Sequence, residues 1–155
     1  MRIQLKTDYA LRVVCYLMGK TEMVRVVDLA KTLGIPFNSL RYVITRLSEQ
    51  GIVMTICGPT GGVRLLRVPE KISVLEVLEC MEGKIKLNRM QGQTVGGTAN
   101  DLVDQYLTEL QERLRLFLNL TTFDTLTVPY QVPRVKKKRS PQKQVGASPQ
   151  EDVQI

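Results

Sequence analysis

The chain has 155 residues, 43% of them hydrophobic and 24% charged, which is the composition of one ordinary globular domain with extensions. Histidine is absent and the three cysteines form no CxxC pair, so hydrolase triads, most zinc chemistry and a disulfide framework are disfavoured. No apolar run approaches the ~18 residues that span a bilayer, and no signal-peptide pattern opens the chain. We therefore expect a soluble, intracellular protein with no membrane partner.

The net charge of +7 comes from 22 basic and 15 acidic residues, but it is unevenly distributed. Six basic residues are concentrated near the C-terminus: Arg134, Lys136, Lys137, Lys138, Arg139 and Lys143. The rest of the chain is only mildly basic, so net charge alone is weak evidence for a polyanionic partner. Residues 127–155 are rich in proline and poor in apolar clusters, which predicts a disordered basic tail. Such a tail suits nonspecific contact with phosphates, or it is simply a solvated extension.

Three short amphipathic helices are predicted in the first fifty residues. Apolar residues recur at three- and four-residue spacing from 7 to 19, from 26 to 33 and from 36 to about 50. Gly34 supplies the left-handed residue that ends such a helix, and Pro36 suits the start of the next one. Two periodic helices joined by a tight turn that contains glycine are typical of a helix-turn-helix unit.

A β-hairpin is predicted directly after the third helix. Two β-prone runs, 52–56 and 63–66, flank the turn Gly58-Pro59-Thr60-Gly61-Gly62. A hairpin in this position is a wing, so we interpret residues 1–83 as a winged helix-turn-helix DNA-binding domain. The alternative is three small helices that pack with a ribbon for purely structural reasons.

The remaining part of the ordered chain divides into a short helix, a loop and a long helix. A capping box from Ser73 to Glu76 opens the short helix, and residues 84–97 show no period and predict a loop. Residues 98–126 include a predicted helix of about 22 residues, which is longer than the small body needs for its own core. Its apolar residues step by four, three, four and three, the spacing of a two-helix seam. The predicted dimer interface therefore comprises Val103, Leu107, Leu110, Leu114 and Phe117. The expected fold class is mainly α, with a small β-hairpin wing and a long C-terminal dimerisation helix.

The candidate DNA-binding residues lie on the third helix, in the hairpin and at the start of the first helix. A recognition helix reads the major groove through solvent-facing side chains near its N-terminal end, where Arg41 suits guanine and Asn38 suits adenine. The other polar groups suit phosphate or the minor groove. The full set is Lys6, Thr7, Tyr9, Asn38, Ser39, Arg41, Tyr42, Arg46, Thr60 and Arg64. The alternative is an exposed helix face that is polar without any binding role.

These segments resemble a family of bacterial winged-helix regulators that includes IscR, NsrR and CymR. The resemblance rests on four segments: residues 7–12, Leu29-Ala30 to Gly34-Ile35, Leu47 to Gly51-Ile52-Val53, and the wing sequence from Gly58 to Leu65. It extends more loosely to the long helix. It implies a cytoplasmic bacterial homodimer, nucleoid-associated when bound, that recognises a pseudo-palindromic operator in double-stranded DNA and usually acts as a repressor.

The first departure from the family concerns its cofactor. Many members hold an iron–sulfur cluster on three cysteines in the loop before the dimer helix. Here that loop has no cysteine, and Met90 stands near the position of the first ligand. A thioether does not replace an anionic thiolate, so we expect no metal and no cofactor. Cys80 and Cys15 are expected to be buried apolar residues.

The second departure is Cys57, which stands where the family often has an arginine before the wing turn. An exposed thiol at this place would be a redox switch for DNA binding. The frequent burial of free cysteine favours the alternative, an inward-facing strand residue without a signalling role.

Two other functions remain open alternatives. The first is a winged-helix interaction module that acts through a partner protein, because fold alone does not fix function. The second is a cluster-bound sensor of redox state or nitric oxide with atypical ligands. An enzyme is not expected, because the sequence has no phosphate-binding glycine motif, metal-ligand spacing or paired nucleophile and base.

Overall fold

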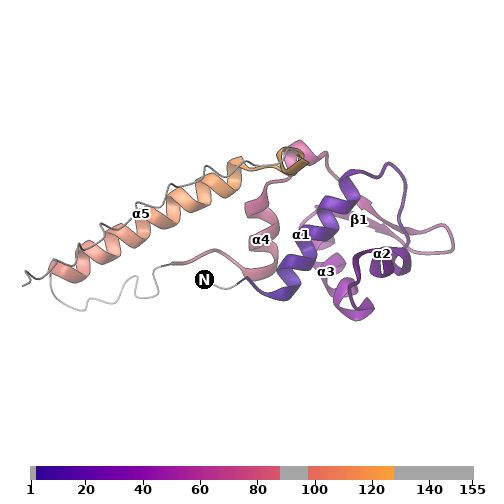
Figure 1. The fold of residues 1–155 in the computed structure, drawn as a ribbon, viewed down its shortest axis with the longest axis horizontal. Helices are drawn as coiled ribbons and strands as arrows, with labels where there is room; N and C mark the ends of the chain where they lie inside the picture. Colours follow the sequence, from indigo (N-terminus) through magenta and orange to yellow (C-terminus); the bar gives the residue numbers. More distant parts are fainter. Residues whose placement is uncertain (1–2, 88–97, 128–155) are drawn as a thin grey trace, which may run out of the picture.

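Three helices open the chain in the computed structural model, which describes residues 3–87 and 98–127 (Figure 1). They are α1 (Leu5–Met18), α2 (Val26–Leu33) and α3 (Phe37–Glu49). Their apolar faces meet in one core, because residues three and four apart share a side of a helix. Val13 and Leu40 in this core are completely buried. The three helices predicted from apolar spacing are confirmed, with boundaries that differ by two residues or fewer.

The turn between α2 and α3 is short and is held by backbone hydrogen bonds. Gly34 ends α2 in the left-handed conformation at φ 63°, and its N–H donates to the carbonyl of Lys31 at 3.3 Å. The N–H of Ile35 donates to the carbonyl of Ala30 at 3.1 Å. Pro36 follows with φ −55° and leads into α3, as its fixed ring geometry favours. The two helices therefore form a helix-turn-helix unit.

The predicted hairpin is present and antiparallel. Its strands are β1 (Val53–Ile56) and β2 (Gly62–Leu65). The register pairs Val53 with Leu65, Met54 with Arg64, Thr55 with Val63 and Ile56 with Gly62. Val53 and Val63 point into the core and are buried, whereas Arg64 is exposed. The hairpin thus has one face on the helical body and one face in solvent.

Two adjacent glycines let the backbone of the hairpin approach other segments closely. A Cβ at Gly61 would lie 2.1 Å from the carbonyl oxygen of Ile56. A Cβ at Gly62 would lie 2.4 Å from the carbonyl oxygen of Val24. Val24 and Val63 exchange two backbone hydrogen bonds of 2.9 Å, which attach the hairpin to the segment between α1 and α2. Any larger residue at either glycine would therefore displace backbone.

Helix α4 (Val74–Glu82) packs against both α1 and α3. A one-turn 3-10 helix, η1 (Pro69–Lys71), leads into it. The Ser73 hydroxyl accepts a hydrogen bond from the Glu76 N–H at 3.2 Å, which confirms one half of the predicted capping box. The Glu76 carboxylate pairs with Arg67 instead of returning to the Ser73 N–H. Gly83 follows the last turn with φ 79°.

The long helix α5 (Thr98–Leu120) extends away from the body, as Figure 1 shows. Its C-terminal end returns to the body through the 3-10 helix η2 (Phe123–Thr127). Phe123 is completely buried in the same core as α1 and α3. Its N–H donates to the carbonyl of Ile72 at 3.1 Å, and the N–H of Val74 donates to the carbonyl of Thr121 at 2.8 Å. The end of α5 is therefore anchored on the body beside α4.

The described residues confirm the expected fold class, a mainly helical winged helix-turn-helix with a two-stranded wing and a long C-terminal helix. No helix in these described ranges is long and apolar enough to cross a membrane. The predicted disordered tail beyond Thr127 and most of the predicted loop at 84–97, with Met90, lie outside the described residues.

Candidate nucleic-acid interface

Helix α3 presents one apolar face and one polar face. Its buried residues are Leu40, Val43, Ile44 and Leu47, which pack into the core. Asn38, Arg41 and Tyr42 are exposed on the opposite side, and Ser39 is half-buried. Within the described part of the chain, the side chains of Asn38 and Arg41 form no hydrogen bond or ion pair. Their donors and acceptors are therefore available to base edges.

The start of α1 lies beside this polar face through Lys6. The Lys6 ammonium stands 4.2 Å from the centre of the Tyr42 ring, a cation–π contact between α1 and α3. Both side chains are exposed, so their polar groups remain accessible to a phosphate. Tyr9 differs, because its ring is half-buried and packs against the core.

Thr7 does not match the expected phosphate contact, because it is buried and already hydrogen-bonded. Its hydroxyl donates to Glu82 Oε1 at 2.5 Å, and the same oxygen accepts the Gln4 N–H at 2.8 Å. These two hydrogen bonds, that of Thr7 first, lower the pKa of Glu82. Thr7 thus joins α1 to the end of α4. Its apolar surroundings on α1 could have indicated this position, but its partner is 75 residues away in the sequence.

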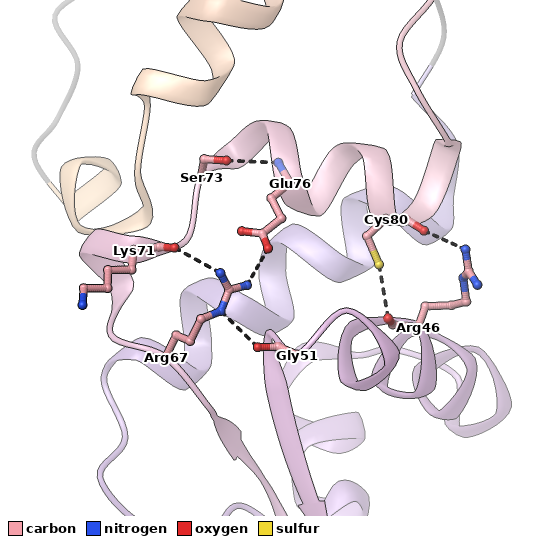
Figure 2. A network of polar contacts seen from close by, with 7 residues as sticks. All are labelled: Arg46, Gly51, Arg67, Lys71, Ser73, Glu76 and Cys80. Atoms are coloured by element: carbon pink, nitrogen blue, oxygen red, sulfur yellow. Dashed lines mark hydrogen bonds and ion pairs between the residues drawn. The ribbon is translucent and has the colours of Figure 1, made fainter.

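Arg46 also has a structural partner at the place where a phosphate contact was expected. Its Nη1 donates to Glu49 Oε2 at 3.0 Å. Its Nη2 donates to the carbonyl of Cys80 on α4 at 3.1 Å, the contact drawn in Figure 2. In return, the Cys80 thiol donates to the Arg46 carbonyl at 3.3 Å. Arg46 therefore attaches α3 to α4. Cys80 is buried as expected, and burial is the main cause of its raised pKa.

The wing carries three exposed side chains of interest. Thr60 lies in the turn and Arg64 lies on the solvent face of β2, and neither forms a side-chain hydrogen bond with another described residue. Cys57 directly follows β1 and is exposed. The inward-facing placement that we favoured from burial statistics is therefore wrong for Cys57. Thr55 shares the side of β1 on which Val53 is buried but is already exposed, so burial on this side of the strand does not extend as far as position 57.

Helix α5 exposes more apolar side chains than the sequence spacing indicated. Of the expected interface, Val103, Leu110 and Phe117 are exposed, whereas Leu107 and Leu114 are half-buried. The reason is that this edge of α5 faces its own chain: Gln111 Oε1 accepts the Leu87 N–H at 2.9 Å, and Arg115 pairs with Glu79 of α4.

The residues that spacing alone missed on α5 are Leu102, Tyr106, Leu116 and Leu120, all exposed. Tyr106 and Leu120 lie on the same side as the three exposed expected residues. We call Val103, Tyr106, Leu110, Phe117 and Leu120 the α5 strip; their steps of three, four, seven and three residues keep them on one side of a helix. The apolar spacing is compatible with a dimer interface on either edge of the helix. The contacts with α4 and Leu87 show that one edge faces its own chain and that the other is exposed.

An outward polar face on the second helix of a helix-turn-helix, next to an exposed hairpin, defines a winged helix-turn-helix protein. The profile of the Rrf2 family, described as "Iron-dependent Transcriptional regulator", matches residues 3–129 of this chain. The chain belongs to the Rrf2 family.

Named relatives agree with this assignment. The chain is 39% identical over 89 residues to the transcriptional regulator NsrR of Bacillus licheniformis, covering 56% of this chain and 62% of NsrR. It is 32% identical over 133 residues to the transcriptional regulator IscR of Klebsiella pneumoniae (strain 342), covering 81% of this chain and 79% of IscR. The chain spans about 60% of the length of the NsrR relatives that it matches.

Solved structures show the same fold. The cysteine regulator CymR of Bacillus subtilis superimposes with a TM-score of 0.67 at 22% identity, over 81% of this chain and 95% of CymR. A transcriptional regulator of Listeria innocua gives a TM-score of 0.74 at 23% identity, over 90% of this chain and 95% of that protein.

The family's description names iron, but the positions of the cysteines in the described residues do not fit an iron–sulfur cluster site. Cys15 is half-buried on α1, Cys57 is exposed at the wing, and Cys80 is buried on α4. The loop at 84–97 contributes no cysteine. In the part of the chain that the structure describes, no group of three or more His, Cys, Asp or Glu side chains could hold a metal ion.

Proposed function

We propose that the protein is a homodimeric, sequence-specific DNA-binding regulator that acts as a repressor. The observation that carries this proposal is the free polar face of α3, where Asn38 and Arg41 are exposed and without partners among the described residues. The exposed Arg64 and Thr60 on the wing would contact the DNA backbone beside the groove that α3 enters. Repression requires only that the bound protein covers a promoter, with no further contact to polymerase.

The α5 strip supports a dimer as the DNA-binding species. Each of its five side chains is at least 41% exposed, and together they form an apolar row along a 23-residue helix. At 1.5 Å per residue this helix is about 35 Å long, enough for a two-helix interface with a second copy. A twofold dimer carries two recognition helices related by symmetry, so its operator would be a pseudo-palindrome.

Operator selection from random DNA with the full-length protein tests the DNA-binding proposal. We expect a palindromic motif, and an affinity that falls steeply with salt because phosphate contacts release counterions. Arg41→Ala should cost about 1–3 kcal/mol at one base position of the motif. Arg12→Ala is the matched control, because Arg12 is paired with Asp8 on the exposed side of α1. Recovery of no motif would refute the proposal, and an equal loss on every sequence would reassign Arg41 to phosphate.

Light scattering tests the dimer. Leu110→Glu places a charge in the middle of the α5 strip and is expected to give a monomer, because an unpaired buried charge is costly. Glu112→Gln, an exposed change on another side of the same helix, should remain dimeric. A dimeric Leu110→Glu variant would place the interface elsewhere.

We also propose that the protein works without an iron–sulfur cluster. The separate positions of Cys15, Cys57 and Cys80 support this, together with the loop that contains no cysteine. The regulatory signal would then enter by another route, and the exposed thiol of Cys57 in the wing is the candidate.

A further inference from the structure

Arg67 joins three segments of the chain at the base of the wing, the end of the hairpin opposite its turn. It lies two residues after β2, and its Nε donates to the carbonyl of Gly51, one of the three residues between α3 and β1, at 3.0 Å. Its Nη1 donates to the carbonyl of Lys71 at 3.4 Å, and its Nη2 donates to Glu76 Oε1 on α4 at 2.6 Å (Figure 2). All three guanidinium nitrogens are therefore engaged within the protein.

Glu76, the partner of Arg67, is itself held in place. Its N–H is bonded to the Ser73 hydroxyl that caps α4, so the carboxylate stands on the fixed first turn of the helix. The two side chains of the ion pair are 33% and 32% exposed, so water screens them less than it screens a surface pair. A planar arginine fork on one carboxylate and two carbonyls is a well-defined geometry.

The recognition helix is attached to the same side of α4 one turn further on. Cys80 lies four residues after Glu76, and its carbonyl and thiol both bond with Arg46 of α3. Residues four apart lie one above the other on a helix. Figure 2 shows the two attachments along α4, with the wing base at Arg67 and α3 at Arg46.

We propose that Arg67 and Glu76 are positioning residues for DNA binding, which fix the orientation of the wing relative to the recognition helix by holding both on α4. This inference rests on the proposed DNA-binding function. The pairing of Val24 with Val63 also holds the hairpin, so loss of the ion pair loosens the base of the wing without unfolding it. The wing residues Thr60 and Arg64 then meet the DNA with a less defined geometry, which lowers affinity.

Glu76→Gln distinguishes a positioning role from a purely electrostatic role, because the two roles predict opposite changes in DNA affinity. Removing a carboxylate makes the protein more basic, which by itself strengthens binding to a polyanion. Under our proposal Glu76→Gln weakens binding instead, by about tenfold, a change typical of a coupling through one network. The matched control is Glu70→Gln, because Glu70 is an exposed carboxylate without a hydrogen bond among the described residues. Its affinity should stay within about twofold of the original protein.

A charge-conserving variant sharpens the comparison. Arg67→Gln combined with Glu76→Gln leaves the net charge unchanged, so a purely electrostatic role predicts normal binding. The positioning role predicts a loss at least as large as that of Glu76→Gln alone, because the pair is broken in both variants and Arg67→Gln also removes the hydrogen bonds to the carbonyls of Gly51 and Lys71. Operator affinity is measured with full-length protein, after circular dichroism has shown that each variant is folded. Unchanged or tighter binding by Glu76→Gln would overturn the inference.

The exposed Cys57 offers a readout that needs no DNA. A nitroxide label attached there reports the motion of the wing, in a Cys15→Ala background that leaves Cys80 buried. We expect the electron paramagnetic resonance lines to narrow in Glu76→Gln and to remain unchanged in Glu70→Gln. Identical spectra for the two variants would overturn the positioning role. If operator selection yields no motif but the lines narrow, the pair still fixes the wing on α4, and it is the proposed DNA-binding function that fails.

Discussion

Phe123→Ala tests the finding that the end of α5 completes the core of the N-terminal body. Phe123 is the largest completely buried side chain among the described residues. A buried phenylalanine removes at least ~150 Å² from water, worth about 4 kcal/mol at ~25 cal/mol per Å². Alanine retains a small part of that area, and the cavity left behind adds to the loss. We therefore expect unfolding free energy to fall by about 3–5 kcal/mol.

Urea unfolding followed by circular dichroism measures this change. The protomer concentration must be equal for all variants, because dissociation of a dimer would be coupled to unfolding. Leu126→Ala is the control, because Leu126 lies in the same short helix η2 but is 45% exposed. It should lose less than about 1 kcal/mol. An equally small loss for Phe123→Ala would refute the reasoning, since the end of α5 would then not contribute to the core.

Three further predictions concern alkylation of Cys57, reconstitution with iron and sulfide, and the carboxylate of Glu82. Alkylation of Cys57 should weaken operator binding, as measured by fluorescence anisotropy, while Cys57→Ser protein treated in the same way binds normally. Anaerobic reconstitution with iron and sulfide should leave a colourless protein, whereas charge-transfer bands in its spectrum would show that dispersed cysteines do bind a cluster. Glu82 has a lowered pKa because of the hydrogen bonds from Thr7 and from the Gln4 N–H, so its ionised form stabilises the fold. This stabilisation is complete above the unfolded pKa and is lost as pH falls through the folded pKa. The thermal stability of Glu82→Gln should therefore differ most from the original protein at neutral pH and approach it in acid.

Local patterns in the sequence were sufficient for most of the fold. Apolar spacing predicted α1, α2 and α3, Gly34 predicted the end of α2, and the turn with three glycines predicted the hairpin. These signals are local because helix periodicity and left-handed turns depend on residues a few positions apart. The exposed face of α3 with Asn38 and Arg41 follows from the same periodicity.

The sequence could not show which polar residues have partners far along the chain. Thr7 and Arg46 are of the residue types that bind phosphate, yet each is bonded to α4, 75 and 34 residues away. The same holds for α5, where the apolar spacing fits a dimer interface on either of two edges of the helix. The ion pair between Arg115 and Glu79 shows that one of these edges faces α4. Burial of Phe123 and exposure of Cys57 are likewise decided by packing.

Taken by itself, the sequence determined the order of the elements and the family to which the chain belongs. Both depend on local spacing and on motifs that are contiguous in the chain. Only the tertiary structure decided which basic residues are free to meet DNA and which hold the body together. A guanidinium or a hydroxyl binds whichever partner the fold brings within hydrogen-bond distance, and the fold gives such partners to Arg46 and Arg67 but, among the described residues, none to Arg41.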